Sequence, residues 1–248
     1  MMEEVLAKIR PHTSSSLPHQ RAPATILRAL EETFREQDTE NTPTAYYATL
    51  LTTLEGILQK NDTSLGDGDV LPADLYLLAL VIPFVSQNVV RSNISTILKL
   101  TAPLFPKLLP HAPPLRSQLT IYGTLFLSLD RSQLETKGIR QAFASVLQLC
   151  LDQRPKVRKK ACGVVKDVLA SPPPPMARHP YADQVAEWIK SALVTATAGG
   201  LHRLKSSRNL AEDPSAERSI HVLALVRLVL RNLPPPVSAA ILTILTCC

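Results

Sequence analysis

The stretch Leu149–Leu169, LCLDQRPKVRKKACGVVKDVL, contains a complete helix–turn–helix corner. An apolar segment ends at Leu151, and a turn follows at Asp152-Gln153-Arg154. Pro155 then takes the first position of a second helix, where its missing N–H costs no hydrogen bond. The apolar residues of this second helix recur at intervals of three and four: Val157, Ala161, Val164, Val165 and Val168. The spacing predicts an amphipathic helix with one buried stripe.

The composition of all 248 residues favours the same kind of structure throughout the chain. Aromatic residues make up only 4% and there are 8 glycines, which suits closely packed helices with small side chains. The 21 prolines fall between apolar periodic runs, where they divide the chain into short helices. No segment shows the alternating pattern of a strand. The sequence therefore predicts an all-α protein built from many short helices.

The expected helices follow from these runs and their flanking prolines. Pro23, Pro43 and Pro72 each open a helix, and a break is expected at Pro83 within the apolar run Leu75–Val85. The full set of expected helices is Glu3–Ile9, 23–38, 43–58, 72–85, 88–109, 113–129, Glu135–Leu151, 155–169, Tyr181–Thr197, Ser219–Leu233 and Val237–Cys248. Residues 199–200, a Gly-Gly pair, are expected to stop the helix before them.

Helix pairs then recur at a nearly constant interval, with starts near residues 43, 91, 136, 181 and 236. A period of about 40–47 residues is typical of HEAT and armadillo arrays. The predicted architecture is a single right-handed α-solenoid of about five repeats over residues 1–248. Mobile loops are expected near 60–71, 171–179 and 199–216, where Gly, Pro and polar residues gather. Because Val237–Cys248 is apolar and has no polar cap, the chain is expected to be the N-terminal fragment of a longer protein.

The net charge of +6 conceals a gradient along the chain. Residues 1–90 carry 6 Lys and Arg against 12 Asp and Glu, whereas residues 91–210 carry 18 against 6. A basic middle region on a helical scaffold suits phosphate or an acidic protein surface, although solvated helix faces would give the same count.

Two basic clusters are the candidate sites for RNA or a protein partner. The first lies at the corner and consists of Arg154, Lys156, Lys159, Lys160 and Lys166. It could contact RNA phosphates or an acidic partner, act as a nuclear localisation signal, or be a repeat turn with solvated lysines around it. The second, Arg203, Lys205 and Arg208, lies in a polar segment that could fold on a partner or serve as a connector.

The motifs of most enzyme classes and of bound groups are missing from the sequence. It contains no GxxxxGK[ST], GxGxxG or GxSxG pattern, and no metal-ligand spacing, so no catalytic residue, cofactor or metal is predicted. Four cysteines in a chain without a signal peptide favour reduced thiols, with Cys150 and Cys162 in the core. The longest apolar run is too short for a membrane span, and neither a membrane nor a small-molecule substrate is expected.

The corner resembles the HEAT repeat signature, with Asp152 in the turn and Val157-Arg158 at the start of the second helix. The resemblance implies that Asp152 and Arg158 form the ladder that links one repeat to the next. The N-terminal block is more specific, since RPHTSS at 10–15, QRAPA at 20–24 and LE at 30–31 resemble the ribosomal RNA-processing protein 12 family. TPTAYYATLLTTL at 42–54 and RPKVRKKA at 154–161 are similar to that family too.

The resemblance implies a non-enzymatic scaffold of the nucleus and nucleolus that acts in pre-ribosome maturation, chiefly of the small subunit, and in export. Its implied partners are pre-ribosomal RNA, ribosome assembly factors and the Ran/karyopherin export machinery, with shuttling to the cytoplasm. The alternative function is a generic HEAT-repeat adaptor that binds acidic proteins, for instance in nuclear transport.

Overall fold

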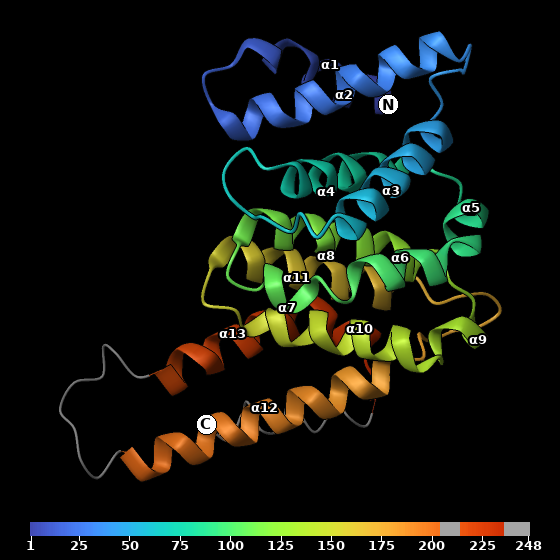
Figure 1. Ribbon diagram of the computed structural model, residues 1–248. Coiled ribbons are helices and arrows are strands. Elements are labelled where there is room, and N and C mark those ends of the chain that lie inside the picture. The colour runs from blue at the N-terminus through green and yellow to red at the C-terminus, as the bar shows by residue number, and fades with distance from the viewer. Residues whose placement is uncertain (204–213, 236–248) are drawn as a thin grey trace. The chain divides into compact units, whose positions relative to one another are not determined.

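The regular structure in the described part of the chain is entirely helical. A computed structural model describes residues 1–203 and 214–235, in which every regular element is an α- or 3-10 helix, so the all-α prediction is confirmed (Figure 1). Contacts divide the chain into two compact units, Met1–Leu129 and Asp130–Cys248. The sequence predicted one array over residues 1–248 and did not mark this boundary.

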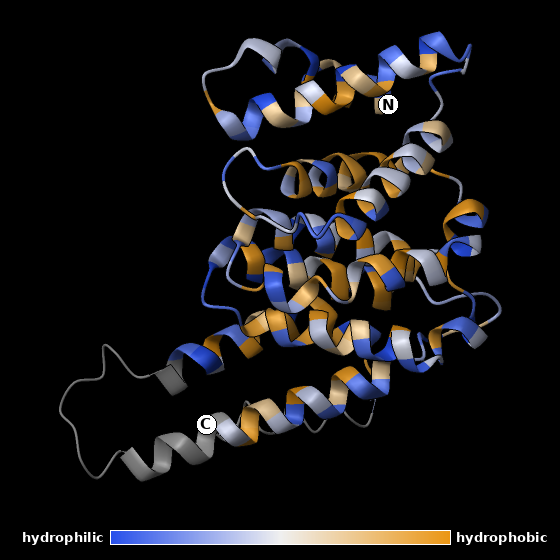
Figure 2. Ribbon diagram, in the orientation of Figure 1, coloured by the Kyte–Doolittle hydropathy of each residue, from blue (hydrophilic) through white to orange (hydrophobic). Residues whose placement is uncertain are grey.

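The first unit consists mainly of paired helices. In chain order its elements are α1 (Met2–Ala7), η1 (Arg10–Ser14), α2 (Pro18–Glu36), α3 (Pro43–Gln59), α4 (Val70–Val81), η2 (Ile82–Phe84), α5 (Gln87–Ser92), α6 (Ile94–Thr101), α7 (Phe105–Leu108) and α8 (Ala112–Ser128). Helix α4 packs against α2, α3 and α8, and α3 also contacts α6. Because α4 has neighbours on several sides, most of its residues are buried, and it is largely orange in Figure 2, whereas α2 alternates between apolar and polar residues.

The N-terminal block that resembled a known family folds back onto α2. The carboxylate of Glu31 on α2 accepts hydrogen bonds from Arg10 Nε at 2.9 Å and from the Tyr46 hydroxyl at 2.9 Å. Arg10 also pairs with Glu3, with a distance of 2.6 Å from its Nη1 to Oε1. This network ties α1, η1, α2 and α3 together, and it explains why Arg10 and Glu31 occur in the same signature. The adjacent residues 12–14 belong to the 3-10 turn η1, and Ser15 is its C-cap.

The second unit contains two further helix pairs in its described residues. Its elements are α9 (Arg131–Leu134), α10 (Lys137–Gln148), η3 (Leu149–Leu151), α11 (Pro155–Ala170), α12 (Ala182–Arg203), α13 (Pro214–Val229) and η5 (Leu230–Asn232). Helix α10 packs against α11, α12 packs against α13, and α11 packs against α13. The expected starts of the helix pairs near residues 43, 136 and 181 agree with Pro43, Lys137 and Ala182. The start expected near 91 falls inside α5, and the start near 236 lies outside the described residues.

Three boundaries differ from those predicted. Helix α2 begins at Pro18, and Pro23 lies inside it, because Pro18 already supplies the favoured first position. Helix α12 continues through the Gly-Gly pair at 199–200 to Arg203, since a glycine weakens a helix by only about 1 kcal/mol relative to alanine and does not by itself end one. The expected helix 88–109 is divided into α5, α6 and α7, with breaks at Asn93 and beside the prolines at 103 and 106.

Two of the predicted loops contain anchored residues. In the segment between α3 and α4, Gly68 has a φ of +95°, and Asp67 lies 3.4 Å from His19 of α2. A side chain at Gly68 would also collide with Pro18, so glycine is required there. The segment after α11 ends at His179, which is only 3% exposed. The mobility of the segments 60–71, 171–179 and 199–216 stays a prediction.

Candidate partner-binding surface

The corner between η3 and α11 is closed by Asp152. Its Oδ1 accepts hydrogen bonds from the backbone N of Arg154 at 2.8 Å and from Arg154 Nε at 2.9 Å, and its Oδ2 lies 2.7 Å from Arg154 Nη2. The side chain of Asp152 is 12% exposed and that of Arg154 is 36% exposed. The hydrogen bond from the Arg154 side chain is the main reason that the pKa of Asp152 is lowered. The guanidinium of Arg154, predicted as a partner contact, is therefore occupied in holding the turn.

Arg158 supports the same corner through the backbone. Its Nη1 donates to the carbonyl of Asp152 at 2.6 Å and to that of Gln153 at 3.2 Å. These carbonyls precede the first turn of α11, so Arg158 links the helix to the turn before it. The recorded hydrogen bonds of Asp152 and Arg158 thus lie within one repeat, and a ladder from these residues to a neighbouring repeat stays a prediction.

The lysines of the first cluster lie along one face of α11. Lys156, Lys159 and Lys166 are exposed, and Lys160 is half-buried. At 100° per residue their positions lie within a single stripe, opposite the buried Val157, Val165 and Val168. Lys166 lies 3.5 Å from the carboxylate of Asp167, an exposed neighbour. The structure therefore brings together the four lysines that the sequence selected, and it separates them from Arg154.

Gly163 occupies the middle of this lysine stripe. It follows Lys159 by four residues and precedes Lys166 by three, so it shares their face. Apart from the adjacent residues and the backbone of α11 itself, no atom lies within 4 Å of the position that a Cβ would take there. No side chain therefore projects from α11 at Gly163, between the lysines, and the backbone of a partner can approach the helix closely there.

The second predicted cluster is only partly within the described residues. Arg203 is the last residue of α12. Lys205 and Arg208 lie outside the described residues. The prediction that this cluster contacts a partner is therefore untested.

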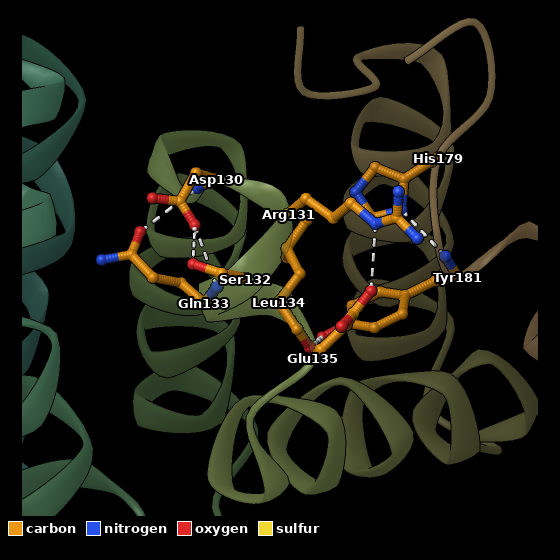
Figure 3. Close-up of polar contacts among 8 residues, drawn as sticks. All are labelled: Asp130, Arg131, Ser132, Gln133, Leu134, Glu135, His179 and Tyr181. Carbon is orange, nitrogen blue, oxygen red and sulfur yellow. Dashed lines mark hydrogen bonds and ion pairs between the residues drawn. The ribbon is translucent and has the colours of Figure 1, made fainter. Parts of the chain in front are cut away.

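A buried contact fixes the start of α12 against the preceding helices of the same unit (Figure 3). The hydroxyl of Tyr181 donates to the carbonyl of Leu134, the last residue of α9, at 2.6 Å. Its ring lies against Phe143 of α10, with 4.3 Å between centroids. His179 Nδ1 accepts a hydrogen bond from the backbone N of Tyr181 at 3.1 Å, and burial lowers the pKa of His179 to about 4. The imidazole is thus neutral near pH 7, with its unprotonated Nδ1 facing the backbone N–H of Tyr181.

Helix α9, although only four residues long, is capped at its start. Asp130 accepts from the backbone N of Gln133 at 2.9 Å, and Gln133 Oε1 accepts from the backbone N of Asp130 at 3.2 Å. This reciprocal capping box holds α9 in place, so the carbonyl of Leu134 is available to Tyr181. This contact is not apparent from the sequence, in which Tyr181 marks only the expected start of a helix.

Exposed aliphatic side chains on α13 were also missed. Ile220 is 63% exposed, Leu223 37% and Leu228 45%, whereas Val222, Leu225 and Val229 are buried. Apolar residues occupy both faces of α13, so their periodicity in the sequence could not show which face is buried. Arg227 lies on the same exposed face as these three residues.

The following statements on cysteines, metal sites and membrane-spanning helices concern residues 1–203 and 214–235. Cys150 and Cys162 are buried thiols without a disulfide, as the apolar stripes predicted. In residues 1–203 and 214–235 no three His, Cys, Asp or Glu side chains are grouped so that they could hold a metal ion. Within these ranges, no helix has both the length and the apolar character needed to cross a membrane.

Comparisons with known proteins agree with the resemblance in the sequence. The model of a family described as RRP12-like, N-terminal HEAT repeats matches residues 2–247. The chain is similar to ribosomal RNA-processing protein 12 of Saccharomyces cerevisiae, with 28% identity over 92% of this chain and 19% of that protein. It is similar to an RRP12-like protein of Gallus gallus, with 28% identity over 95% of this chain and 16% of that protein.

A further relative is the putative ribosomal RNA-processing protein 12 of Schizosaccharomyces pombe, with 29% identity over 62% of this chain and 13% of that protein. The chain thus spans less than a fifth of the length of these relatives. No solved structure matches it.

Proposed function

Because the chain belongs to the RRP12-like family through its N-terminal HEAT repeats, we propose that it is a non-enzymatic scaffold of pre-ribosome maturation. It acts in the nucleolus and nucleus on pre-rRNA processing, chiefly for the small subunit, and on subunit export. Its partners are pre-ribosomal RNA and assembly factors, with the Ran/karyopherin machinery during export and shuttling. The names of the relatives in Saccharomyces cerevisiae and Schizosaccharomyces pombe, which refer to ribosomal RNA processing, support this role.

The observation that carries RNA binding is the lysine face of α11. Lys156 and Lys159 project from one exposed side of the helix, and Lys166 continues that side two turns later. Ammonium groups on flexible stems suit phosphate oxygens, and their contacts carry no base specificity. The proposed RNA contact therefore depends on phosphate charge and on the shape of the RNA.

A salt titration of RNA binding tests this proposal. The full 248-residue chain is titrated with a structured fragment of small-subunit pre-rRNA at several salt concentrations. The variant Lys156→Ala/Lys159→Ala/Lys166→Ala should bind more weakly, and its slope of log K against log salt should be shallower by about 2, since each lost phosphate contact removes about 0.7–0.9. Arg158 is kept, because it holds the corner through two carbonyls.

The matched control is Lys60→Ala/Lys99→Ala/Lys107→Ala, which removes the same charge from exposed positions of the first unit. This variant should retain most of the RNA affinity of the unsubstituted chain. Equal losses in the two triple variants would show that RNA responds only to net charge, and the α11 face would then have no special role.

A further inference from the structure

Helix α13 presents an apolar face that its own unit does not bury. Ile220, Leu223 and Leu228 are spaced by three and five residues and lie on one side, together with Arg227. Their exposed fractions, 63%, 37% and 45%, contrast with 4% or less for Leu225, Val226 and Val229 on the opposite side. Three exposed aliphatic side chains on one helical face are typical of a surface that binds an apolar partner.

The lysine face of α11 belongs to the neighbouring helix. Helices α11 and α13 pack against each other. Burial is the main reason that the pKa of His221 on α13 is lowered, and the positive charge of Arg158 on α11 adds to this effect. The exposed lysines and the exposed aliphatic residues therefore lie on adjoining helices of one unit.

The aliphatic residues of α13 suit a peptide, whereas the lysines of α11 alone suit RNA as well. Phosphates would pair with the lysines, but they would leave Ile220, Leu223 and Leu228 in water. Bases would need aromatic side chains on which to stack, and the large exposed hydrophobic residues of the described second unit are aliphatic. A peptide with carboxylates on one side and leucine-like side chains on the other would pair with the lysines of α11 and cover the aliphatic residues of α13. Gly163 leaves room for its backbone near α11.

We propose that Lys156, Lys159 and Lys166 of α11, with Ile220, Leu223 and Leu228 of α13, form a docking surface for an acidic amphipathic peptide segment of a partner protein. The carboxylates of the peptide pair with the lysines, and its apolar side chains cover α13. The inference deepens the proposed scaffold function by giving the class of protein partner, although the surface itself follows from the structure alone. RNA at the same lysines is the competing outcome.

The test uses fluorescein-labelled 18-residue peptides in which Leu recurs every third or fourth position and Glu fills the opposite face, in each of the possible registers. One matched set carries Ser in place of Leu, and another carries Gln in place of Glu. The full chain should bind the Glu/Leu set, and both substituted sets should bind at least ~10-fold more weakly, which corresponds to about 1.4 kcal/mol. No binding of the Glu/Leu set in any register would overturn the proposal.

Variants of the chain then locate the surface. Ile220→Ser/Leu223→Ser should weaken the peptide ~10-fold or more and leave RNA affinity unchanged, because only the peptide needs the apolar half. The control Leu109→Ser/Val194→Ser removes two other exposed aliphatic side chains and should change neither affinity. Hydrogen exchange should show peptide-dependent protection along α11 and α13, and protection elsewhere alone would contradict the assignment.

The two proposals fail in different ways. If Lys156→Ala/Lys159→Ala/Lys166→Ala loses RNA while every peptide fails to bind, the surface is an RNA site and the peptide proposal is wrong. If the peptide binds and RNA affinity does not respond to the lysines, the RNA proposal is wrong and the peptide proposal holds.

Discussion

Arg154 makes the ion pair with Asp152, at 2.7 Å between Nη2 and Oδ2, whereas Arg158, the arginine of the expected inter-repeat ladder, bonds to backbone carbonyls of the same turn. The geometry of the turn explains the difference. Asp152 and Arg154 are two residues apart and both precede the helix, so the carboxylate can meet the backbone N–H and the guanidinium of Arg154 together. Arg158, one turn into α11, reaches back to the carbonyls.

Replacing Asp152 should destabilise the corner. In Asp152→Asn the ion pair is lost, and because Arg154 is partly exposed the cost in free energy of unfolding should be about 1 kcal/mol. Since the folded pKa of Asp152 is lowered, its contribution is present above the unfolded value of 3.8 and is lost as the pH falls through the folded value. Urea unfolding should show a smaller difference between the variant and the unsubstituted chain at pH 3 than at pH 7.

The control for this variant is Glu135→Gln, which breaks the pair with Arg131. Both side chains of that pair are more than half exposed, so its loss should change the free energy of unfolding very little. A loss equal to that of Asp152→Asn would mean that the Asp152 pair contributes no more to stability than an exposed ion pair.

Removing the hydroxyl group of Tyr181 should weaken the contact between the start of α12 and the end of α9. Tyr181→Phe keeps the ring against Phe143 but deletes the hydroxyl that donates to Leu134 at 2.6 Å. The free energy of unfolding should fall by about 1–2 kcal/mol, because a buried carbonyl loses a donor. Tyr76→Phe, at a tyrosine that is 42% exposed, is the control and should have almost no effect in the same urea titration.

His179 should make stability fall in mild acid. Its folded pKa of about 4 lies below the ordinary histidine value of 6.5, so the unfolded chain takes up a proton first as the pH falls between these values. The loss should reach about 3 kcal/mol once the pH is below 4. His179→Gln can still accept from the backbone N of Tyr181 but cannot titrate there, so its stability should be flatter between pH 7 and pH 4. Parallel curves for the two proteins would show that His179 does not titrate on unfolding.

Asp74 should have the opposite pH dependence. Burial raises its pKa well above the ordinary value of 3.8, and its carboxylate oxygens are buried without a recorded hydrogen-bond partner. The folded chain therefore holds the proton more strongly, and stability is lost as the pH rises above 3.8.

The variant Asp74→Asn should consequently gain stability relative to the unsubstituted chain between pH 4 and pH 7, by about 1–3 kcal/mol. Thermal unfolding across that range measures the gain. Glu40→Gln, an exposed position on the loop before α3, serves as the control. A constant difference between Asp74→Asn and the unsubstituted chain at all pH values would contradict a buried, protonated Asp74.

The sequence by itself determined the helices and their pairing, because these depend on neighbours along the chain. Pro43 at a first turn, the stripe of α11 and the pair interval near 45 residues are local signals, and the structure reproduces them. The same locality explains the errors at Pro23, where Pro18 had already begun the helix, and at residues 199–200, where glycine weakens a helix without ending it. The lysines of α11 could be selected from the sequence, since charge density and helical spacing place them on one face.

Only the tertiary structure decided which side chains meet and which apolar faces stay exposed. Tyr181 and Leu134 are 47 residues apart, and Arg10 and Glu31 are 21 apart, so no local pattern relates them. The exposed side of α13 was hidden in the sequence because apolar residues occupy both of its faces. Its exposure depends on how α11 and α12 cover the other side, since burial is a property of packed neighbours and not of a residue type.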